Sequence, residues 1–365
     1  MSRTILIMAG GTGGHVFPAL AVADCLRLKD WKVVWLGTRA GMEARLVPEH
    51  GYEMAWVKFA GMRGKGLLRW ATLPFMLLMA MWQSAAAIFR FRPDVVLGMG
   101  GFTAFPGGLM ASLLGKPLVI HEQNSVAGLT NRVLACLAER VLVAFPSAFN
   151  NAGDKPIGCS KPAMTWCGNP VRTDIANLAA PEQRLAGRQG NLRILVVGGS
   201  LGAAALNEAV PQALALIPEA QRPAVVHQSG AKNLEQLKAN YEAAGVAVDA
   251  RAFIDDMGEM YAWCDVIVCR AGALTLAEIT SAGVASVLVP YPHAVDDHQT
   301  GNARFLSENG AALLLPQQGL TPAGLADLLT GFSREKLLAM AQAARKLAKP
   351  EATATVAQAC MELAG

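Results

Sequence analysis

Short, uninterrupted apolar runs recur along the chain, and most of them lead through a turn into a stretch with helical periodicity. The runs cover residues 4–8, 33–36, 95–97, 118–121, 141–144, 193–197, 266–269 and 286–289. Strands that are buried on both faces are apolar at successive positions, whereas half-exposed strands alternate. The pattern therefore predicts parallel sheets with helices on both faces, which is a doubly wound α/β fold.

Glycine-rich turns follow three of the predicted strands. The first reads M-A-G-G-T-G-G-H-V-F-P at residues 8–18 and precedes a predicted helix at 19–29. The others read G-M-G-G-F-T-A-F-P-G-G at 98–108 and G-G-S-L-G-A at 198–203. Glycines let backbone N–H groups approach an anion at the positive end of a helix, so each turn is a candidate phosphate site. A turn that needs glycine only for close packing is the alternative, since the first one lacks the lysine of a P-loop.

The first and third glycine turns lie about 190 residues apart in a chain of 365 residues. Two similar strand–turn–helix units at that separation predict two α/β domains, which the length also favours. We place the boundary in the turn C-G-N-P-V-R at 167–172, so that the first domain comprises 1–168 and the second 169–349. The C-terminal helix expected at about 350–365 is assigned to the first domain.

Composition narrows the possible classes of function. The net charge of +4 gives no basis for nucleic-acid binding. The six histidines lack the spacing of metal ligands, so we expect no metal. The seven cysteines are odd in number and include no C-x-x-C pair, which favours the reduced thiols of a cytosolic protein over a disulfide framework. The first apolar run is too short for a signal peptide.

Residues 54–93 contain no aspartate or glutamate but six lysines and arginines. Between these basic positions, residues 67–89 are rich in leucine, methionine, tryptophan and phenylalanine. A transmembrane helix, a core helix and a peripheral membrane helix all fit such a segment. The basic flanks and the aromatic residues favour the peripheral helix, with anionic phospholipid as its partner. Its membrane-facing residues are then Leu67, Trp70, Phe75, Met79 and Trp82.

Polar side chains gather after several predicted strands, at the edge where doubly wound folds bind ligands. H-E-Q-N-S at 121–125 and R-A-G-A-L-T-L-A-E at 270–278 each follow a strand, and D-D-H-Q-T-G-N-A at 296–303 opens a helix. Glu278 lies about one turn into its helix, where its carboxylate can accept two hydrogen bonds from a ribose diol. His15 beside the first glycine turn is the leading candidate base, because imidazole exchanges a proton near neutral pH, and Glu122 is the alternative.

Seven of these motifs, in this order, carry a resemblance to the GT-B glycosyltransferases. They are GGTGGHVFPALA at 10–21, GGFTAFPGG at 100–108, HEQN at 121–124, GNPVR at 168–172, GGSLGA at 198–203, RAGALTLAE at 270–278 and DDHQTGNA at 296–303. The chain is most similar to the members that add N-acetylglucosamine to a lipid-linked muramoyl sugar. Phe105 departs from the family pattern, which more often has glycine at that position.

The resemblance implies two Rossmann-like domains that face a cleft, with the acceptor and the membrane bound by the first and the nucleotide sugar by the second. The implied reaction moves N-acetylglucosamine from UDP-N-acetylglucosamine to the muramoyl 4-hydroxyl of lipid I, with inversion, to give lipid II and UDP. No cofactor is then required, because helix N-termini and Arg172 can stabilise the leaving diphosphate. The implied location is the cytoplasmic face of the inner membrane, with lipid I, anionic phospholipid and cell-wall synthesis proteins as partners.

The resemblance also implies roles for individual residues. Those expected to bind UDP-N-acetylglucosamine are Thr12, Gly13, Gly14, Asn124, Arg172, Ser200, Ile254, Ala273, Leu274, Thr275, Leu276, Ala277, Glu278 and Gln299. Within this set, Ile254 is expected at the uracil, Ser200 at the phosphates and Gln299 at the transferred sugar. The acceptor diphosphate is expected at the glycine turns of the first domain, at Gly11, Gly101, Gly107 and Gly108.

Two other functions fit part of this pattern. A GT-B transferase with a different lipid or natural-product acceptor would share the glycine turns and the hydrophobic helix. A nicotinamide-dependent oxidoreductase would also have paired glycine turns, but its second strand should end in an acidic residue, whereas the run at 33–36 leads into Gly37-Thr38-Arg39. The H-E-Q-N and G-G-T-G-G-H motifs favour the cell-wall enzyme.

Overall fold

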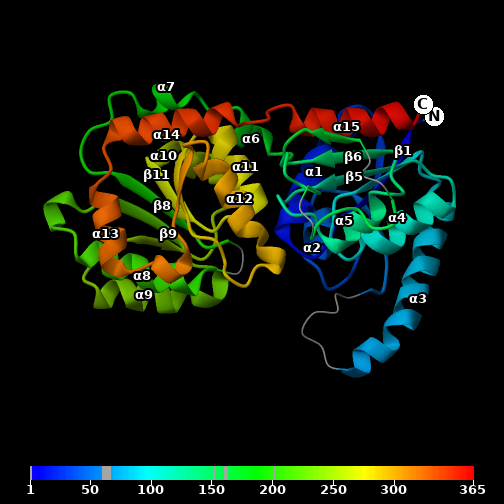
Figure 1. Ribbon diagram of the computed structural model, residues 1–365, viewed down its shortest axis with the longest axis horizontal. Coiled ribbons are helices and arrows are strands. Elements are labelled where there is room, and N and C mark those ends of the chain that lie inside the picture. The colour runs from blue at the N-terminus through cyan, green and yellow to red at the C-terminus, as the bar shows by residue number, and fades with distance from the viewer. Residues whose placement is uncertain (1, 60–66, 151–152, 160–162, 200–201) are drawn as a thin grey trace. The chain divides into compact units, whose positions relative to one another are not determined.

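The chain folds into two compact units in the computed structural model, which is described for residues 2–59, 67–150, 153–159, 163–199 and 202–365 (Figure 1). The side chains of residues 67–71 and 295 lie outside this description. Unit 1 comprises Met1–Val171 with Lys349–Gly365, and unit 2 comprises Arg172–Ala348. Each unit is built around one parallel sheet.

The sheet of unit 1 has seven strands in the order β3-β2-β1-β4-β5-β6-β7. They are β1 (Thr4–Met8), β2 (Lys32–Gly37), β3 (Glu53–Trp56), β4 (Val95–Gly98), β5 (Leu118–Glu122), β6 (Arg140–Val143) and β7 (Met164–Trp166). In β1, Ile5 and Ile7 pack into the apolar cluster on one face of the sheet, and Leu6 and Met8 pack into the cluster on the other. Because both faces are buried, the strand is apolar at successive positions.

Helices cover both faces of this sheet. They are α1 (Gly13–Arg27), α2 (Glu43–Glu49), α3 (Leu67–Phe91), α4 (Ala104–Leu113), α5 (Leu129–Leu134) and α15 (Ala352–Leu363). α15 packs against α1, and its Val356 and Cys360 join the core cluster that contains Ile5. α3, α4 and α5 cover the other face, through residues such as Ile88 and Ala111.

The sheet of unit 2 has six strands in the order β10-β9-β8-β11-β12-β13. They are β8 (Arg193–Val197), β9 (Ala224–Gln228), β10 (Asp249–Arg251), β11 (Val266–Cys269), β12 (Ala285–Leu288) and β13 (Ala312–Leu314). Its helices are α6 (Thr173–Ala176), α7 (Pro181–Leu185), α8 (Ala204–Ala215), α9 (Leu234–Ala243), α10 (Met257–Trp263), α11 (Ala273–Ala282), α12 (His298–Ser307), α13 (Pro322–Thr330) and α14 (Arg334–Lys346).

In both sheets the first strand lies in the interior, and the chain changes direction beside it, between β1 and β4 and between β8 and β11. Doubly wound folds bind ligands at this reversal, beyond the carboxyl ends of the strands. The predicted α/β class, with two doubly wound Rossmann-like sheets, is confirmed. The cleft between the domains stays a prediction.

Two local features differ from the predictions. The helix expected at 19–29 begins at Gly13, so His15 belongs to the first turn of α1 instead of to the loop before it. The edge strands β3, β7, β10 and β13 were not predicted, and neither was the inner strand β9. β3, β7 and β10 are short and carry exposed or polar residues, as in the D-A-R sequence of β10, so they lack the continuous apolar pattern of the inner strands. β13 is apolar, A-L-L, but only three residues long.

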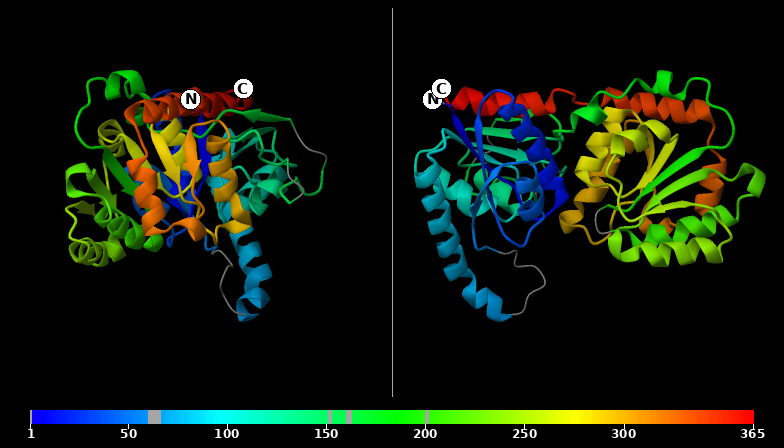
Figure 2. Two further views of the ribbon diagram at one scale, coloured as in Figure 1. Left: turned by 60° about the vertical axis from the view of Figure 1, so that its left-hand side comes forward. Right: turned by 180° about the vertical axis from the view of Figure 1, so that it is seen from behind.

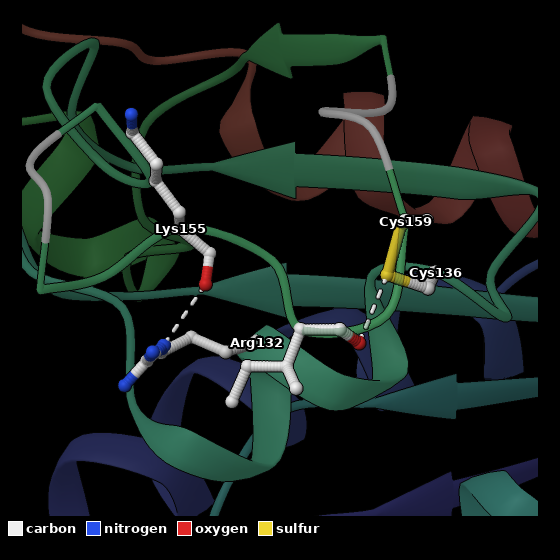
Figure 3. Close-up of a disulfide and its surroundings, with 5 residues drawn as sticks. Arg132, Cys136, Lys155 and Cys159 are labelled. Carbon is white, nitrogen blue, oxygen red and sulfur yellow. Dashed lines mark hydrogen bonds between the residues drawn. A yellow bond between two sulfur atoms is a disulfide. The ribbon is translucent and has the colours of Figure 1, made fainter.

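Cys136 and Cys159 form a disulfide, which corrects the expectation that all thiols are reduced (Figure 3). Residues 153–159 lie against the end of α5 and bring Cys159 beside Cys136, although 23 residues separate the two in sequence. Arg132 Nε donates to the carbonyl of Lys155, and the N–H of Ile157 donates to the carbonyl of Arg132. The pairing depends on this fold of the segment, so the spacing of the cysteines gives no sign of it. The other five cysteines are free.

Candidate active site

The first glycine turn joins β1 to α1 at the carboxyl edge of the unit 1 sheet. Gly11 has a φ of +93°, a left-handed backbone that residues with side chains rarely adopt. Thr12 is the N-cap of α1, and its carbonyl accepts the N–H of His15. Three residues predicted to line the donor sugar, Thr12, Gly13 and Gly14, therefore form the start of α1. The positive end of this helix is directed toward the ligand edge of the sheet.

The second glycine turn packs directly on the first. A Cβ on Gly101 would clash with the carbonyl of Gly10, so the two turns predicted to hold a diphosphate are neighbours. Gly107 and Gly108 lie inside α4 and are buried. A Cβ on Gly107 would clash with Met8 of β1, and one on Gly108 would lie 2.8 Å from a side chain of α5. Packing accounts for glycine at these two positions, so the diphosphate prediction for this turn rests on Gly101.

His15 lies where both turns meet the polar residues that follow β5. Its Nδ1 is 3.0 Å from Oε1 of Gln123. Gly100 approaches the ring so closely that a Cβ there would lie 2.8 Å from both Cε1 and Nδ1 of His15. The imidazole is partly exposed, whereas Gln123 is buried. A fixed, reachable imidazole beside two candidate phosphate turns is suited to general-base chemistry.

The carboxylate of Glu122, the alternative base, is occupied by the segment that follows it. Oε1 accepts the N–H of Asn124 at 2.9 Å, and Oε2 accepts from Asn131 Nδ2 at 2.8 Å and from the N–H of Gly128 at 3.1 Å. The residue is 2% exposed. These bonds shape the segment that carries Asn124 and leave the carboxylate poorly placed to take a substrate proton. We therefore favour His15 as the base.

Glu43 supports the first glycine turn from inside the unit, although no motif in the sequence indicates this role. Its buried carboxylate accepts the N–H of Gly11 at 3.0 Å, the N–H of Thr38 at 3.0 Å and the Thr38 hydroxyl at 2.9 Å. A Cβ on Gly10 would lie 2.7 Å from Oε1 of Glu43, and one on Gly37 would lie 2.8 Å from its Cγ. Because the N–H of Gly11 points inward to Glu43, Gly11 shapes the turn and leaves other amides to face an anion.

Replacing Glu43 by glutamine should destabilise unit 1. The amide group keeps one acceptor but directs an N–H at a donor of Gly11 or Thr38, so the free energy of unfolding should fall by at least about 1 kcal/mol. Urea unfolding should show a lower midpoint with an unchanged m-value. The same substitution at the exposed Glu242 of α9 is the matched control and should leave the midpoint unchanged. Equal midpoints for the Glu43 variant and the wild type would contradict this bracing role.

The third glycine turn follows β8 in unit 2. Ser200, which the resemblance places at the phosphates, lies outside the described residues, as does Leu201. Gly202 has a φ of +79°, and a Cβ there would clash with the carbonyl of Ser229. α8 begins at Ala204, so this turn also places a helix N-terminus at the carboxyl edge of its sheet.

Glu278 is held inside unit 2 by two partners. The Tyr261 hydroxyl donates to its Oε2 at 3.0 Å, and Nη2 of Arg172 lies 3.6 Å from its Oε1. Burial raises the pKa of Glu278 to about 7, against the opposing effects of Arg172 and of the hydrogen bond from Tyr261. The structure thus brings together two predicted donor residues, Arg172 and Glu278, and adds Tyr261, which the sequence pattern did not reveal.

The residues predicted to line the nucleotide form the first turns of α11. Leu274, Thr275 and Ala277 are partly exposed, so their side chains can contact a ligand. Leu276 is 1% exposed and Ala273 is also buried, so these two face the core of the unit. Ile254, predicted at the uracil, is likewise buried in this structure.

Gln299 is the second residue of α12 and follows an unusual turn. Asp296 and Asp297 have φ values of +52° and +49°, a left-handed region that aspartate tolerates but seldom adopts. Oε1 of Gln299 accepts the N–H of Tyr291 at 2.9 Å. This bond fixes the side chain, and its amide N–H groups are then the part suited to donate to a sugar hydroxyl.

α3 runs along the outside of unit 1 (Figure 2). One face of this helix is apolar and exposed. Ala80, Ser84, Ala87 and Ile88 recur at helical spacing and are buried against unit 1. Elsewhere on the helix, Phe75, Leu78, Trp82 and Phe89 are 67%, 64%, 71% and 66% exposed. Residues 72–91 are therefore not a helix of the protein core. Of the other predicted membrane residues, Met79 is partly buried, and the side chains of Leu67 and Trp70 lie outside the described part of the structure.

Length and composition would also let residues 72–91 cross a membrane, a property shared by core helices and signal sequences.

The predicted donor residues are divided between the units, with Thr12, Gly13, Gly14 and Asn124 in unit 1 and the others in unit 2.

Among the residues that the structure describes, no cluster of three or more His, Cys, Asp or Glu side chains is placed to hold a metal ion.

Two family models match the chain, one in each unit. The glycosyltransferase family 28 N-terminal domain matches residues 5–143, and the glycosyltransferase family 28 C-terminal domain matches residues 193–357. The first match contains the two glycine turns of unit 1 and the H-E-Q-N motif. The second contains the third glycine turn, Glu278 and Gln299.

Curated relatives match over the whole length of the chain. The chain is 61% identical over 363 residues to the UDP-N-acetylglucosamine--N-acetylmuramyl-(pentapeptide) pyrophosphoryl-undecaprenol N-acetylglucosamine transferase of Thiobacillus denitrificans, which covers 100% of this chain and 99% of that protein. It is 59% identical over 364 residues to the protein of the same name from Dechloromonas aromatica, and the match covers 100% of both chains.

Solved structures give the same grouping. The crystal structure of MurG from Acinetobacter baumannii is similar with a TM-score of 0.83 and 40% identity, and the match covers 99% of each chain. The glycotransferase of kitacinnamycin is similar with a TM-score of 0.69 at 19% identity, which supports the fold alone. The family models, the full-length relatives and this structural match together show that the chain belongs to glycosyltransferase family 28.

Proposed function

We propose that this chain transfers N-acetylglucosamine from UDP-N-acetylglucosamine to the muramoyl 4-hydroxyl of lipid I, giving lipid II and UDP in peptidoglycan synthesis. Lipid I is a muramoyl pentapeptide joined through a diphosphate to undecaprenol. The observation that carries this proposal is the 61% identity, over the whole chain, to a transferase named for this donor and this acceptor. The sites in the two units support it, since unit 1 pairs two glycine turns beside a histidine and unit 2 holds a carboxylate suited to a ribose diol.

His15 acts as the general base in this proposal. Its imidazole takes the proton of the muramoyl 4-hydroxyl as the oxygen attacks the anomeric carbon of the donor. The new carbon–oxygen bond forms on the face opposite UDP, and the bond to the diphosphate oxygen breaks with its electron pair leaving on UDP. A single displacement of this kind inverts the α anomer of the donor to the β product and requires no nucleophile from the enzyme.

We expect this transfer to proceed without an added cofactor or metal. The departing diphosphate gains negative charge, and the N-terminus of α8 and the guanidinium of Arg172 are suited to stabilise it. Arg172 is 35% exposed beside Glu278, so it remains reachable. The rate of UDP release should be the same with and without excess EDTA. A rate that EDTA abolishes and Mg²⁺ restores would contradict this expectation.

We further infer that unit 1 contacts the cytoplasmic face of the membrane through α3. One side of the helix packs on the protein, so lipid cannot surround it as it surrounds a spanning helix, whereas the exposed Phe75 and Trp82 suit the headgroup boundary. Lys58, Arg90 and Arg92 are exposed and can attract anionic lipid. A membrane-bound enzyme would meet a lipid-linked acceptor where that acceptor resides.

Replacing both Phe75 and Trp82 by serine should release the chain from anionic phospholipid vesicles without unfolding it. Both side chains are exposed, so the change removes apolar membrane contact and little internal packing. Co-sedimentation with vesicles and thermal melts measure the two effects separately. The control replaces Leu28 and Leu216, which are also exposed, by serine and should sediment like the wild type.

High salt distinguishes the cationic contribution to membrane binding from the aromatic contribution. Near 1 M salt the Debye length falls to about 3 Å, so the cationic part should weaken while the aromatic part persists. Vesicle binding that the Phe75 and Trp82 double variant retains in full would show that α3 is not the membrane contact.

A further inference from the structure

The orientation of the Gln123 side-chain amide is determined by its backbone neighbours. Its Nε2 lies 2.8 Å from the carbonyl oxygen of Met99 and 3.2 Å from that of His121. Carbonyl oxygens only accept hydrogen bonds, so the group that faces them must be the NH₂ of the amide. The carbonyl oxygen Oε1 of Gln123 is therefore the atom that faces His15.

This orientation decides which nitrogen of His15 carries the proton. Oε1 of Gln123 can only accept, and Nδ1 of His15 lies 3.0 Å from it, so Nδ1 must be the N–H donor. A neutral imidazole carries a single N–H, so the lone pair is then on Nε2. Gly100 closes the Nδ1 side, because no Cβ fits between its backbone and the ring. Nε2 is thus both the basic nitrogen and the one on the side away from Gln123.

The hydrogen bonds beyond Gln123 agree with this assignment. His121 is buried, and burial lowers its pKa to about 4, so its imidazole is neutral near pH 7. Its Nε2 lies 2.9 Å from the carbonyl of Gly168 and must donate to it, which leaves Nδ1 to accept from Nε2 of Gln123 at 3.1 Å. In the series of hydrogen bonds that joins Gly168, His121, Gln123 and His15, every N–H group therefore faces an acceptor. If the Gln123 amide were flipped, its oxygen would face two carbonyl oxygens, and neither of them can donate a hydrogen bond.

We propose that Gln123 is a positioning residue that holds His15 in the Nδ1–H tautomer and so presents Nε2 as the base for the acceptor hydroxyl. The role of His15 in this statement rests on the proposed function, whereas the tautomer itself does not. An amide differs from the carboxylate that holds histidine in catalytic triads, because it fixes the tautomer without adding a negative charge beside the ring. The imidazolium formed by proton uptake is then free to release its proton after each turnover.

Two variants separate this role from simple bracing of the loop. Gln123→Met and Gln123→Glu both lose the N–H groups that bond to Met99 and His121. Gln123→Glu also sets an oxygen against those two carbonyls, so it should lose more stability than Gln123→Met. They differ in that glutamate keeps an acceptor oxygen toward His15 and methionine does not. Gln123→Met should lower kcat by about tenfold or more, which is less than the ~10²–10⁴-fold loss of the base itself, with KM for the donor unchanged. Gln123→Glu should retain a clearly higher kcat than Gln123→Met.

The tautomer is read directly from the ¹⁵N chemical shifts of the His15 ring, identified by their absence in His15→Ala. We expect a protonated Nδ1 and an unprotonated Nε2 in the wild type and in Gln123→Glu, and a population with protonated Nε2 in Gln123→Met. A wild-type protein with the proton on Nε2 overturns the proposal even if neither variant folds. Equal kcat for the two variants with equal His15 shifts overturns it as well. If His15→Ala keeps its kcat while the shifts are as expected, the base assignment fails and the tautomer assignment stands.

Discussion

Replacing His15 by alanine is expected to lower kcat by ~10²–10⁴-fold, the usual contribution of a general base. The imidazole is held between Gly100 and Gln123, beside both glycine turns, so its loss removes the proton acceptor and leaves the fold of the turns in place. The affinity for UDP should stay near that of the wild type, because the predicted nucleotide contacts lie in unit 2. Steady-state kinetics with a soluble analogue of lipid I, together with calorimetric titration of UDP, measures both quantities.

His50 provides the matched control for this experiment. It is an exposed histidine at the end of α2, away from the residues assigned to the site, and His50→Ala should keep the wild-type kcat. A His15→Ala enzyme with nearly normal kcat would remove His15 from the mechanism. The hydrogen bonds of Glu122 make that residue a poor substitute, so solvent would then be the remaining proton acceptor.

Replacing Glu278 by alanine is expected to weaken UDP binding by ~1.5–3 kcal/mol, the range for hydrogen bonds to a charged group. The carboxylate is already desolvated and held by Tyr261 and Arg172, so it is preorganised to accept two hydroxyl donors of the ribose. Calorimetric titration of UDP into the folded variant measures the loss. Affinity that is unchanged within error would rule out the ribose contact.

The pH dependence of UDP binding is a second test of the role of Glu278. Burial raises the pKa of Glu278 to about 7, so its ionised fraction increases about tenfold between about pH 6 and pH 8. The ionised form is the stronger acceptor, and UDP affinity should therefore rise over this interval by up to about tenfold. Glu278→Gln is the control, since it retains the titration of UDP itself but lacks the titration of the carboxyl. The same pH dependence in both proteins would contradict the assignment.

The strands and turns that form the site could be predicted because each has a local cause. After the first residue of β1 and of β8, the strands β1, β8 and β11 are apolar at every position because helices cover both faces of each sheet. The glycine turns after β1, β4 and β8 also stand out in sequence. The edge strand β10 could not be predicted in this way, because exposure permits polar residues in it. Pairing with a neighbour at the sheet edge, rather than its own composition, makes that segment a strand.

The supporting residues of the site were beyond prediction for a different reason. Glu43 acts on Gly11 across 32 residues, and Gln123 acts on His15 across 108, so only the folded sheet brings these partners together. Gly107 was predicted to contact the diphosphate because it belongs to a glycine motif. In the structure it is glycine because α4 packs closely on β1. A glycine motif therefore identifies a turn near the site without separating ligand contacts from packing contacts.

The reaction itself is tested most directly by following isotope label from UDP-N-acetylglucosamine into purified lipid I, with release of UDP measured in the same sample. We predict labelled lipid and UDP in equal amounts with the wild-type chain, and a rate lower by ~10²–10⁴-fold with His15→Ala. Release of UDP without labelled lipid, or transfer to a diacylglycerol in preference to lipid I, would contradict the proposed function.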